Sequence, residues 1–241
     1  MKIHLINPNT TASMTEQAVL AAVSVAAPGT EIIGNQPDDG PVSIEGYYDE
    51  AFAVPGMLEQ IRANNHCDAH VIACFDDTGL DSARCIATGP VIGLCEAGCM
   101  AAVSVANSFS IVTTLSRSLP ALTHLIHKYG AERRCVSIRA SDIPVLELED
   151  DSGDALQRIK KEVADAIKKD SAEAILLGCA GMTDLARALS EEFKLPVIDG
   201  VSAAVKHAEG LVAMGLTTSR INGYQYPVKK KYSGSFDRYQ P

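Results

Sequence analysis

Positive charge is scarce in this chain, and long apolar runs are missing from it. The 21 Lys and Arg residues face 30 Asp and Glu residues, which gives a net charge of −9. This balance argues against a general nucleic-acid binder and against a protein held on an acidic membrane surface. Glu96 and Asn107 break the longest apolar candidate, so no stretch reaches the roughly 18 residues of a membrane span. The apolar run at Ile3–Ile6 is far too short for a signal peptide, and we expect a cytoplasmic protein.

Cysteine is present in an odd number, seven in all. In a reducing cytoplasm these are expected to be free thiols. Cys95 and Cys99 lack the second pair or the His cluster that would complete a zinc site. His66, His70 and Cys74 have a spacing that suits a helix, but we predict a strand from His70 onward. We therefore predict no metal site.

The length and the alternation of elements predict an α/β fold. A chain of 241 residues with 46% hydrophobic residues can bury a sizeable core in one or two domains. Short β-branched runs alternate with helical patterns, which predicts parallel sheets covered on both faces. The expected strands are Ile3–Ile6, Glu31–Gly34, His70–Cys74, Val91–Leu94, Ser110–Thr113, Cys135–Arg139, Ala174–Leu177 and Val197–Ile198. Helices are expected from Ala12, over Glu50–Ala63, Thr78–Ile86, Arg117–Lys128, Ala155–Lys168, Thr183–Glu191 and Ser202–Met214, with a loop over Ala140–Gly153.

The second half of the chain repeats the first. Val71–Cys74 matches Leu176–Cys179, and each segment is followed by a Pro-Val-Ile triplet. The offset is 105 residues between the cysteines and 106 between the prolines of the two triplets. We interpret this as an internal duplication that gives two pseudo-symmetric lobes, each a mostly parallel sheet flanked by helices. The predicted division is residues 1–97 plus 205–241 for the first lobe and 98–204 for the second.

Cys74 and Cys179 occupy equivalent positions, directly after a buried strand and before a helix. Ligands of open parallel sheets bind beyond the carboxyl ends of the strands. Backbone N–H groups and the helix dipole at such a turn lower the pKa of a thiol. Two thiols that reach one cleft from opposite sides could move a proton on a single carbon without a cofactor. Each cysteine alone would be interpreted as a packing residue, but the matched pair favours catalysis.

Several segments resemble one enzyme family over almost the whole chain. They are Ile3–Thr11, Ser43–Glu50, Ala73–Leu80, Ile111–Leu115, Leu177–Met182 and Pro196–Gly200. They are similar to the hydantoin racemases and allantoin racemases of the aspartate/glutamate racemase superfamily. Many hydantoin racemases have Cys-Phe-Gly-Asp-Pro-Gly-Leu after the first cysteine, whereas this chain has Asp76 and Thr78 in place of the Gly and the Pro. The difference leaves the cysteine in place and the exact substrate open.

The resemblance implies a cofactor-independent racemase with two α/β lobes and an active site between them. It implies Cys74 and Cys179 as the two acid/base groups, a small-molecule substrate with a hydantoin ring, and a homo-oligomer. The proton at C5 of such a ring becomes acidic only if the enolate oxygen is stabilised, for which backbone N–H groups are the usual device. The candidates follow the cysteines, at Phe75 and at Ala180 and Gly181.

Four further positions are candidate substrate-binding residues, each with a structural alternative. They are Asn9, Tyr48, Thr113 and Thr114. The Asn9 amide could bind the polar edge of the ring or form an Asx turn. Thr113 and Thr114 lie at the equivalent place in the second lobe and are candidates to bind the ring. The structural alternative is that Thr114 or Ser116 caps a helix. Tyr48 lies in a loop that could cross the cleft or pack on the surface.

Other functions stay open at this stage. A decarboxylase of the superfamily is expected to keep one cysteine and lose its partner, so the presence of both argues against it. A cysteine-dependent cis–trans isomerase also uses two thiols and is not excluded by the pattern. Two similar lobes around a cleft could also form a non-catalytic binding protein. Next to Cys74, the acidic residues Asp76 and Asp77 are interpreted as caps of the following helix.

Overall fold

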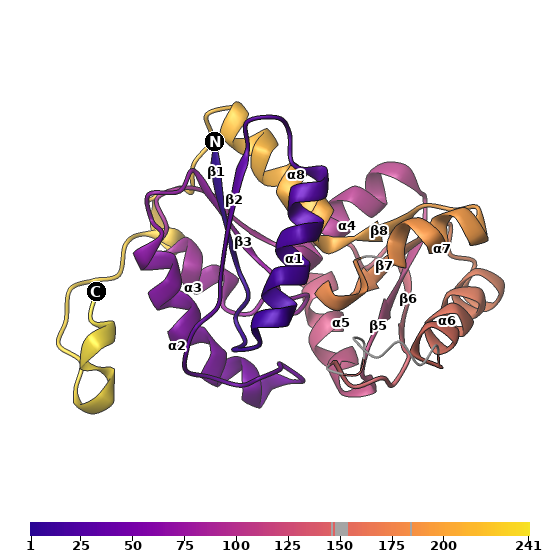
Figure 1. Ribbon diagram of the computed structural model, residues 1–241, viewed down its shortest axis with the longest axis horizontal. Helices are drawn as coiled ribbons and strands as arrows, with labels where there is room; N and C mark the ends of the chain where they lie inside the picture. Colours follow the sequence, from indigo (N-terminus) through magenta and orange to yellow (C-terminus); the bar gives the residue numbers. More distant parts are fainter. Residues whose placement is uncertain (146, 148–153, 184) are drawn as a thin grey trace.

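Two four-stranded parallel sheets form the frame of the computed structural model, which describes residues 1–145, 147, 154–183 and 185–241 (Figure 1). Their strands are β1 (Lys2–Ile6), β2 (Glu31–Asn35), β3 (Ala69–Ile72), β4 (Val91–Gly93), β5 (Phe109–Thr113), β6 (Cys135–Ala140), β7 (Ala174–Gly178) and β8 (Val197–Asp199). The first sheet has the order β2-β1-β3-β4 and the second β6-β5-β7-β8. Each half thus places its own four strands in the same relative order, as a duplicated chain predicts. The predicted α/β fold with two similar lobes is confirmed.

Helices follow the strands in both halves. They are α1 (Ala12–Val25), α2 (Tyr47–Ala63), α3 (Leu80–Arg84), α4 (Leu94–Val105), α5 (Leu119–Lys128), α6 (Asp154–Asp170), α7 (Leu185–Phe193) and α8 (Gly200–Ala213). The short 3-10 turns are η1 (Ser116–Ser118), η3 (Ala180–Met182), η4 (Asn222–Tyr224) and η5 (Gly234–Tyr239). Two predictions were wrong in extent, because α2 begins three residues before Glu50 and α3 has only five residues. The predicted loop over 140–153 and the predicted helix from Thr183 include residues that lie outside the described ones.

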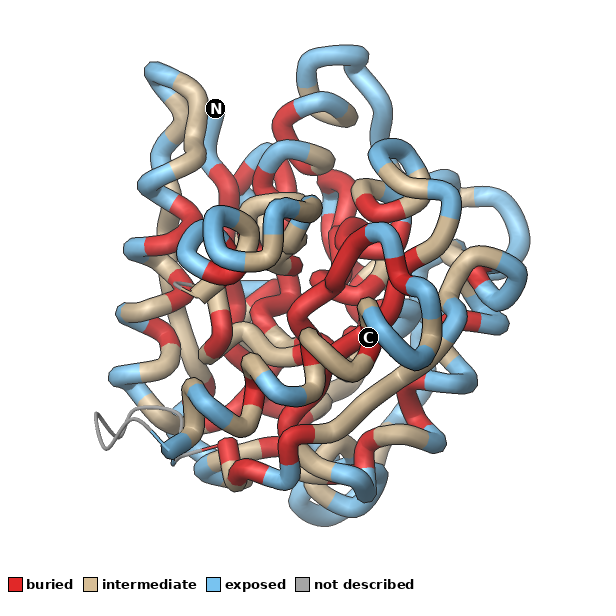
Figure 2. The backbone as a smooth tube through the Cα atoms, turned by 90° about the vertical axis from the view of Figure 1, so that its right-hand side faces the viewer, coloured by how far each residue is buried: buried red, intermediate tan, exposed pale blue. Residues whose placement is uncertain are grey.

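One hydrophobic core runs through both lobes. Alternate side chains of the central strands, such as Ile3 of β1 and Leu176 of β7, belong to the same buried cluster. Helices α1, α4, α5 and α8 supply most of its remaining members and lie between the two sheets (Figure 1). Figure 2 shows the buried parts of the backbone gathered in the interior of the molecule. The outer faces have cores of their own, under α2 and α3 in the first lobe and under α6 and α7 in the second. The strands are therefore buried on both faces, as expected for parallel sheets.

Helix α4 packs tightly against the second sheet. A Cβ on Gly98 would lie 2.5 Å from Cδ1 of Leu176 in β7, so a larger residue there would force the Leu176 side chain to shift. The boundaries predicted at residues 97/98 and 204/205 fall inside α4 and α8, which pack against each other. The division of the chain into those two residue sets stays a prediction.

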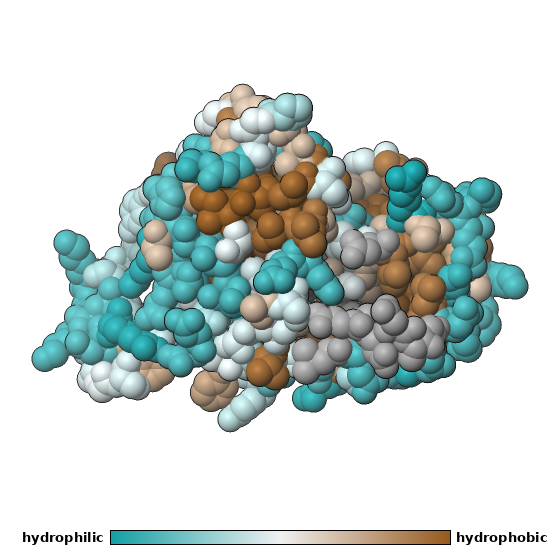
Figure 3. All heavy atoms as spheres, in the orientation of Figure 1, coloured by the Kyte–Doolittle hydropathy of each residue, from teal (hydrophilic) through white to brown (hydrophobic). Residues whose placement is uncertain are grey.

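The surface carries apolar side chains of its own. Figure 3 shows them gathered near α1, where Leu20 is 71% exposed. The segment after α8 runs back along α2 and α3 of the first lobe, where Arg220 donates to the Arg84 carbonyl and Arg238 pairs with Glu59, and it exposes Ile221 and Val228 (Figure 1). Within the described residues, no helix combines the length and the apolar character needed to cross a membrane.

A pair of histidines is buried in the first sheet. His4 of β1 and His70 of β3 are fully buried, and their Nδ1 atoms lie 3.0 Å apart. Burial lowers the pKa of His4 to about 3 and that of His70 to about 4. Repulsion by His70 lowers the pKa of His4 further, and repulsion by His66 lowers the pKa of both rings. Both rings are consequently neutral in the folded protein at neutral pH.

The histidine pair predicts a loss of stability in mild acid. The folded-state pKa values lie below the unfolded value of about 6.5, so the unfolded chain takes up protons first as the pH falls. Between pH 7.5 and pH 5 each histidine should lower the free energy of unfolding by about 2 kcal/mol. The double variant His4→Phe/His70→Leu removes both groups and should lose about 4 kcal/mol less than the wild type over this interval. Urea unfolding followed by far-UV circular dichroism at the two pH values measures the difference, and equal losses in both proteins would contradict the prediction.

Candidate active site

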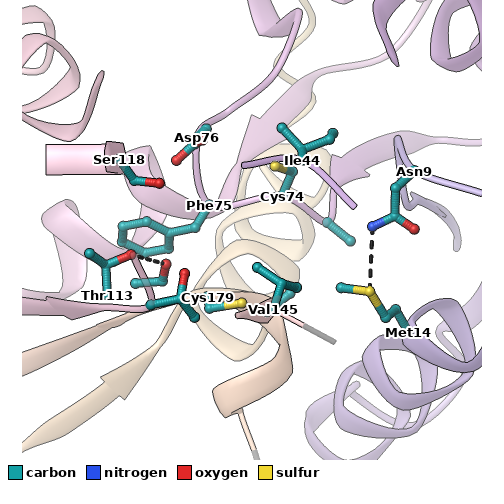
Figure 4. Close-up of a pocket in the computed structure, with 14 residues that line it drawn as sticks. Asn9, Met14, Ile44, Cys74, Phe75, Asp76, Thr113, Ser118, Val145 and Cys179 are labelled. Atoms are coloured by element: carbon teal, nitrogen blue, oxygen red, sulfur yellow. Dashed lines mark hydrogen bonds between the residues drawn. The ribbon is translucent and has the colours of Figure 1, made fainter. Parts of the chain in front are cut away.

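The thiols of Cys74 and Cys179 line one pocket at the carboxyl ends of the two sheets (Figure 4). Cys74 follows β3 and Cys179 follows β7, the third strand of each half. The pocket has about 440 Å³ of empty space, part of it open to solvent. The predicted meeting of the two cysteines is thus present in the structure.

The two sulfurs have matching surroundings. The backbone N–H of Asp76 donates to Cys74, and that of Gly181 donates to Cys179. In each lobe the donor lies two residues after the cysteine, so the duplication extends to the hydrogen bonds. The match ends at the threonines. The Thr78 hydroxyl lies 3.3 Å from Cys74 Sγ, whereas the Thr183 hydroxyl donates to the carbonyl of Ala180 at 2.8 Å.

The expected low pKa of the two thiols is contradicted. Burial raises the pKa of Cys179 to about 11 and raises that of Cys74 further, and the negative charge of Asp76 adds to both shifts. The helices cannot offset this, because α3 has five residues and η3 only three, too short for a substantial dipole. Both thiols therefore carry their protons at neutral pH in the free protein.

The other predicted residues fall into two groups. Phe75, Thr113, Thr114 and Ala180 line the pocket, as does Asn9. The Asn9 side-chain oxygen accepts the Thr11 N–H at 2.9 Å, as in the expected turn, while its Nδ2 has a contact of 3.5 Å with Met14 Sδ (Figure 4). Gly181 acts through its N–H on Cys179 and does not line the pocket. The N–H groups of Phe75 and Ala180 have no acceptor among the described residues.

Tyr48 is not brought into the pocket. Its side chain is 74% exposed and packs against Phe52, with 5.0 Å between the ring centroids. The interpretation as a cleft-crossing loop was wrong because α2 begins at Tyr47 and turns the Tyr48 side chain outward along the helix. The surface-packing alternative is the one that the structure supports.

Residues that the sequence did not single out complete the pocket. They are Met14, Ile44, Ala73, Asp76, Ser118, Val145 and Gly178. Ile44 and Val145 come from loops of different lobes, and the neighbouring Glu45 side chain accepts the Val145 N–H at 3.3 Å. The motif around Glu45 was visible in the sequence, but its contact across the lobes was not.

The family model described as Asp/Glu/Hydantoin racemase matches residues 3–208. The chain belongs to this family. A hydantoin racemase of Rhizobium meliloti is 51% identical over 97% of this chain and 98% of its own. The structure of the allantoin racemase from Klebsiella pneumoniae is also 51% identical, covers 100% of this chain and 99% of its own, and superposes with a TM-score of 0.97. That of the Pseudomonas fluorescens allantoin racemase is 39% identical, with coverage of 97% and 100% and a TM-score of 0.94.

This protein is therefore a racemase. The loop that carries its first cysteine also carries Asp77, which caps a helix other than the expected one. Asp77 was interpreted as a cap of the following helix, but its carboxylate instead accepts the N–H groups of Cys95 and Glu96, each at 3.0 Å. It thus caps α4, the helix between the lobes. Its φ of 48° and a neighbouring glycine make this possible, since a Cβ on Gly93 would lie 2.3 Å from the carboxylate.

The same carboxylate reaches the second lobe. The Tyr129 hydroxyl at the end of α5 donates to Asp77 Oδ2 at 2.6 Å. Burial raises the pKa of Asp77 to about 7, and the three donors offset only part of that rise. Asp77 therefore holds the loop of Cys74 against α4 and α5 together.

Removal of this cap should destabilise the racemase. Asp77→Ala deletes the acceptor of one buried and two part-buried donors, and we expect the free energy of unfolding to fall by about 2–3 kcal/mol. Tyr129→Phe removes one of the three bonds and should cost about 1 kcal/mol. The matched control is Asp81→Ala, which removes an exposed carboxylate paired with Lys128 and should cost at most about 1 kcal/mol. Urea denaturation measures all three, and equal losses for Asp77→Ala and Asp81→Ala would contradict the assignment.

Proposed function

We propose that this racemase interconverts the enantiomers of hydantoin-type rings, either 5-substituted hydantoins or allantoin, by proton transfer at C5 between Cys74 and Cys179. The single observation that carries the proposal is the placement of both thiols on one small pocket, each at the end of the third strand of its lobe. The relatives named as hydantoin racemase and allantoin racemase support the ring as substrate. No cofactor is needed in this scheme.

The chemistry follows from the surroundings of the two sulfurs. One cysteine, as thiolate, takes the C5 proton, so that the C–H bond breaks and an S–H bond forms. The electron pair moves into the adjacent carbonyl and gives an enolate. The opposite thiol then gives its proton to the other face of C5, and a new C–H bond of inverted configuration forms. The donors at Asp76, Thr78 and Gly181 stabilise the thiolates.

The remaining polar groups of the pocket are assigned to the ring. We assign the N–H groups of Phe75 and Ala180, which have no acceptor among the described residues, to the charge that develops on the enolate oxygen, where backbone donors are most effective. Asn9 offers its Nδ2, and Thr113 and Thr114 line the second-lobe side. The Thr113 hydroxyl donates to the Gly178 carbonyl at 3.0 Å, which fixes the orientation of its side chain.

The assembly and location of the racemase are part of the same proposal. We infer a homo-oligomer in the cytoplasm that acts on a small molecule, with no nucleic acid or membrane as partner. The exposed apolar side chains near α1 and in the segment after α8 support contacts between copies of the chain.

Single cysteine variants test the mechanism. Cys74→Ser and Cys179→Ser should each lower racemisation in both directions by about 10²–10⁴-fold, because one acid/base group is lost. In deuterated water each variant should still exchange the C5 proton of one enantiomer only, and the two variants should select opposite enantiomers. Polarimetry and proton NMR on both enantiomers of allantoin and of 5-benzylhydantoin measure the two outcomes.

Cys85→Ser provides the matched control. Cys85 is a free thiol at the end of α3 that donates to the Asp81 carbonyl, away from the pocket. This variant should racemise the substrate like the wild type. If Cys74→Ser and Cys179→Ser also racemise at the wild-type rate, the two-cysteine mechanism is wrong. A wild-type protein that leaves both compounds optically active would instead refute the proposed substrates.

A further inference from the structure

One side chain in the pocket has no place in the mechanism described so far. Asp76 lines the same pocket as Cys74 and Cys179, and its charge acts on both thiols (Figure 4). Asp76 is partly exposed to solvent, and its carboxyl receives no hydrogen bond from the described residues. It is therefore a polar group directed at the space where the substrate would lie.

The charges around Asp76 are acidic. Glu50 of α2 and the adjacent Asp77 are the charged groups that act on it, and Glu45 acts on Cys179 from the same side. The Glu50 Oε1 atom is itself buried without a partner. The cation Arg117 of η1 lies against Gly46 and does not line the pocket. Burial and these acidic neighbours both favour the protonated form of Asp76.

A protonated carboxyl suits this reaction better than a carboxylate. A carboxylate beside a developing enolate and a thiolate would raise the energy of the transition state through repulsion. A neutral acid instead offers an O–H donor, and such a donor in a buried site stabilises developing charge strongly. We propose that Asp76 acts as a neutral acid and donates its O–H to the carbonyl oxygen next to C5. Asp76 is then a catalytic residue, and its assignment rests on the proposed function.

Proton balance gives this role a distinctive pH dependence. The active pocket has lost one proton, with a thiolate on one cysteine and the proton kept on Asp76. Burial raises the pKa of Asp76 to about 7, so the pocket loses its first proton near that pH, well before a thiol with a pKa of about 11 would do so alone. Above that pH the remaining proton exchanges between the Asp76 carboxyl and the thiol. The fraction of molecules with a thiolate and a protonated Asp76 is then independent of pH. The kcat/KM of the wild type should rise up to about pH 7 and stay level above it.

Two variants of Asp76 separate this role from a structural one. Asp76→Asn keeps an N–H donor but removes the titrating group, so its kcat/KM should keep rising with pH to above pH 9. At pH 10 it should reach the wild-type value to within about tenfold. Asp76→Ala removes both the donor and the titrating group, so its kcat/KM should also keep rising with pH and should stay about 10²–10³-fold below that of Asp76→Asn. The control Asp38→Asn removes one exposed acidic charge from the loop before α2 and should keep the wild-type profile.

Each outcome decides the assignment. Racemisation of both enantiomers of allantoin and of 5-benzylhydantoin is followed by polarimetry from pH 5.5 to pH 10, and thermal unfolding confirms that each variant is folded. A wild-type pH profile in Asp76→Asn, or a wild-type rate in folded Asp76→Ala, would overturn the role of Asp76 while the two-cysteine mechanism stands. A wild-type protein that racemises neither compound would overturn the proposed function and this inference with it.

Discussion

The carboxylate of Asp77 is the contact on which the geometry of the pocket depends. It caps α4, accepts the Tyr129 hydroxyl and belongs to the loop that carries Cys74. The position of one thiol is therefore fixed relative to the helix between the lobes and to the second lobe, from which the other thiol comes. Proton transfer through a single carbon tolerates little error in the placement of either group, and a buried, fully bonded carboxylate supplies that precision.

Burial makes the pocket suitable for this chemistry and at the same time makes the thiols weak acids. Exclusion of water strengthens the backbone donors that stabilise an enolate, yet it raises the pKa of both cysteines. The hydrogen bonds at the two sulfurs offset only part of that rise. A carboxyl that can exchange a proton with the thiols, such as Asp76, resolves this conflict. The pocket can then lose a proton near neutral pH although the pKa of each thiol is high.

The sequence was sufficient for the parts of this architecture that are local or repeated. Strand patterns and the offset of 105 residues located Cys74 and Cys179 at equivalent strand ends. It was not sufficient where distant segments meet. Asp77 caps a helix that begins at Leu94, beyond another helix and a strand, so no local pattern reveals the partner. Besides Asp76 in the Cys74 loop, the acidic surroundings of the thiols include Glu50 of α2 and Glu45 of the loop before it, which are distant in the sequence. Tyr48 faces outward because α2 starts earlier than its pattern indicated.

The single core that fills the space between the sheets has a consequence for the history of the chain. Each half of the duplication would, on its own, expose the inner face of its sheet and the helices that now lie between the lobes. An ancestral half-length protein could have covered that face only by pairing with a second copy of itself. Once fusion had joined the copies, each half could diverge separately, and Thr78 and Thr183, which now donate to different acceptors, are a visible trace of that freedom.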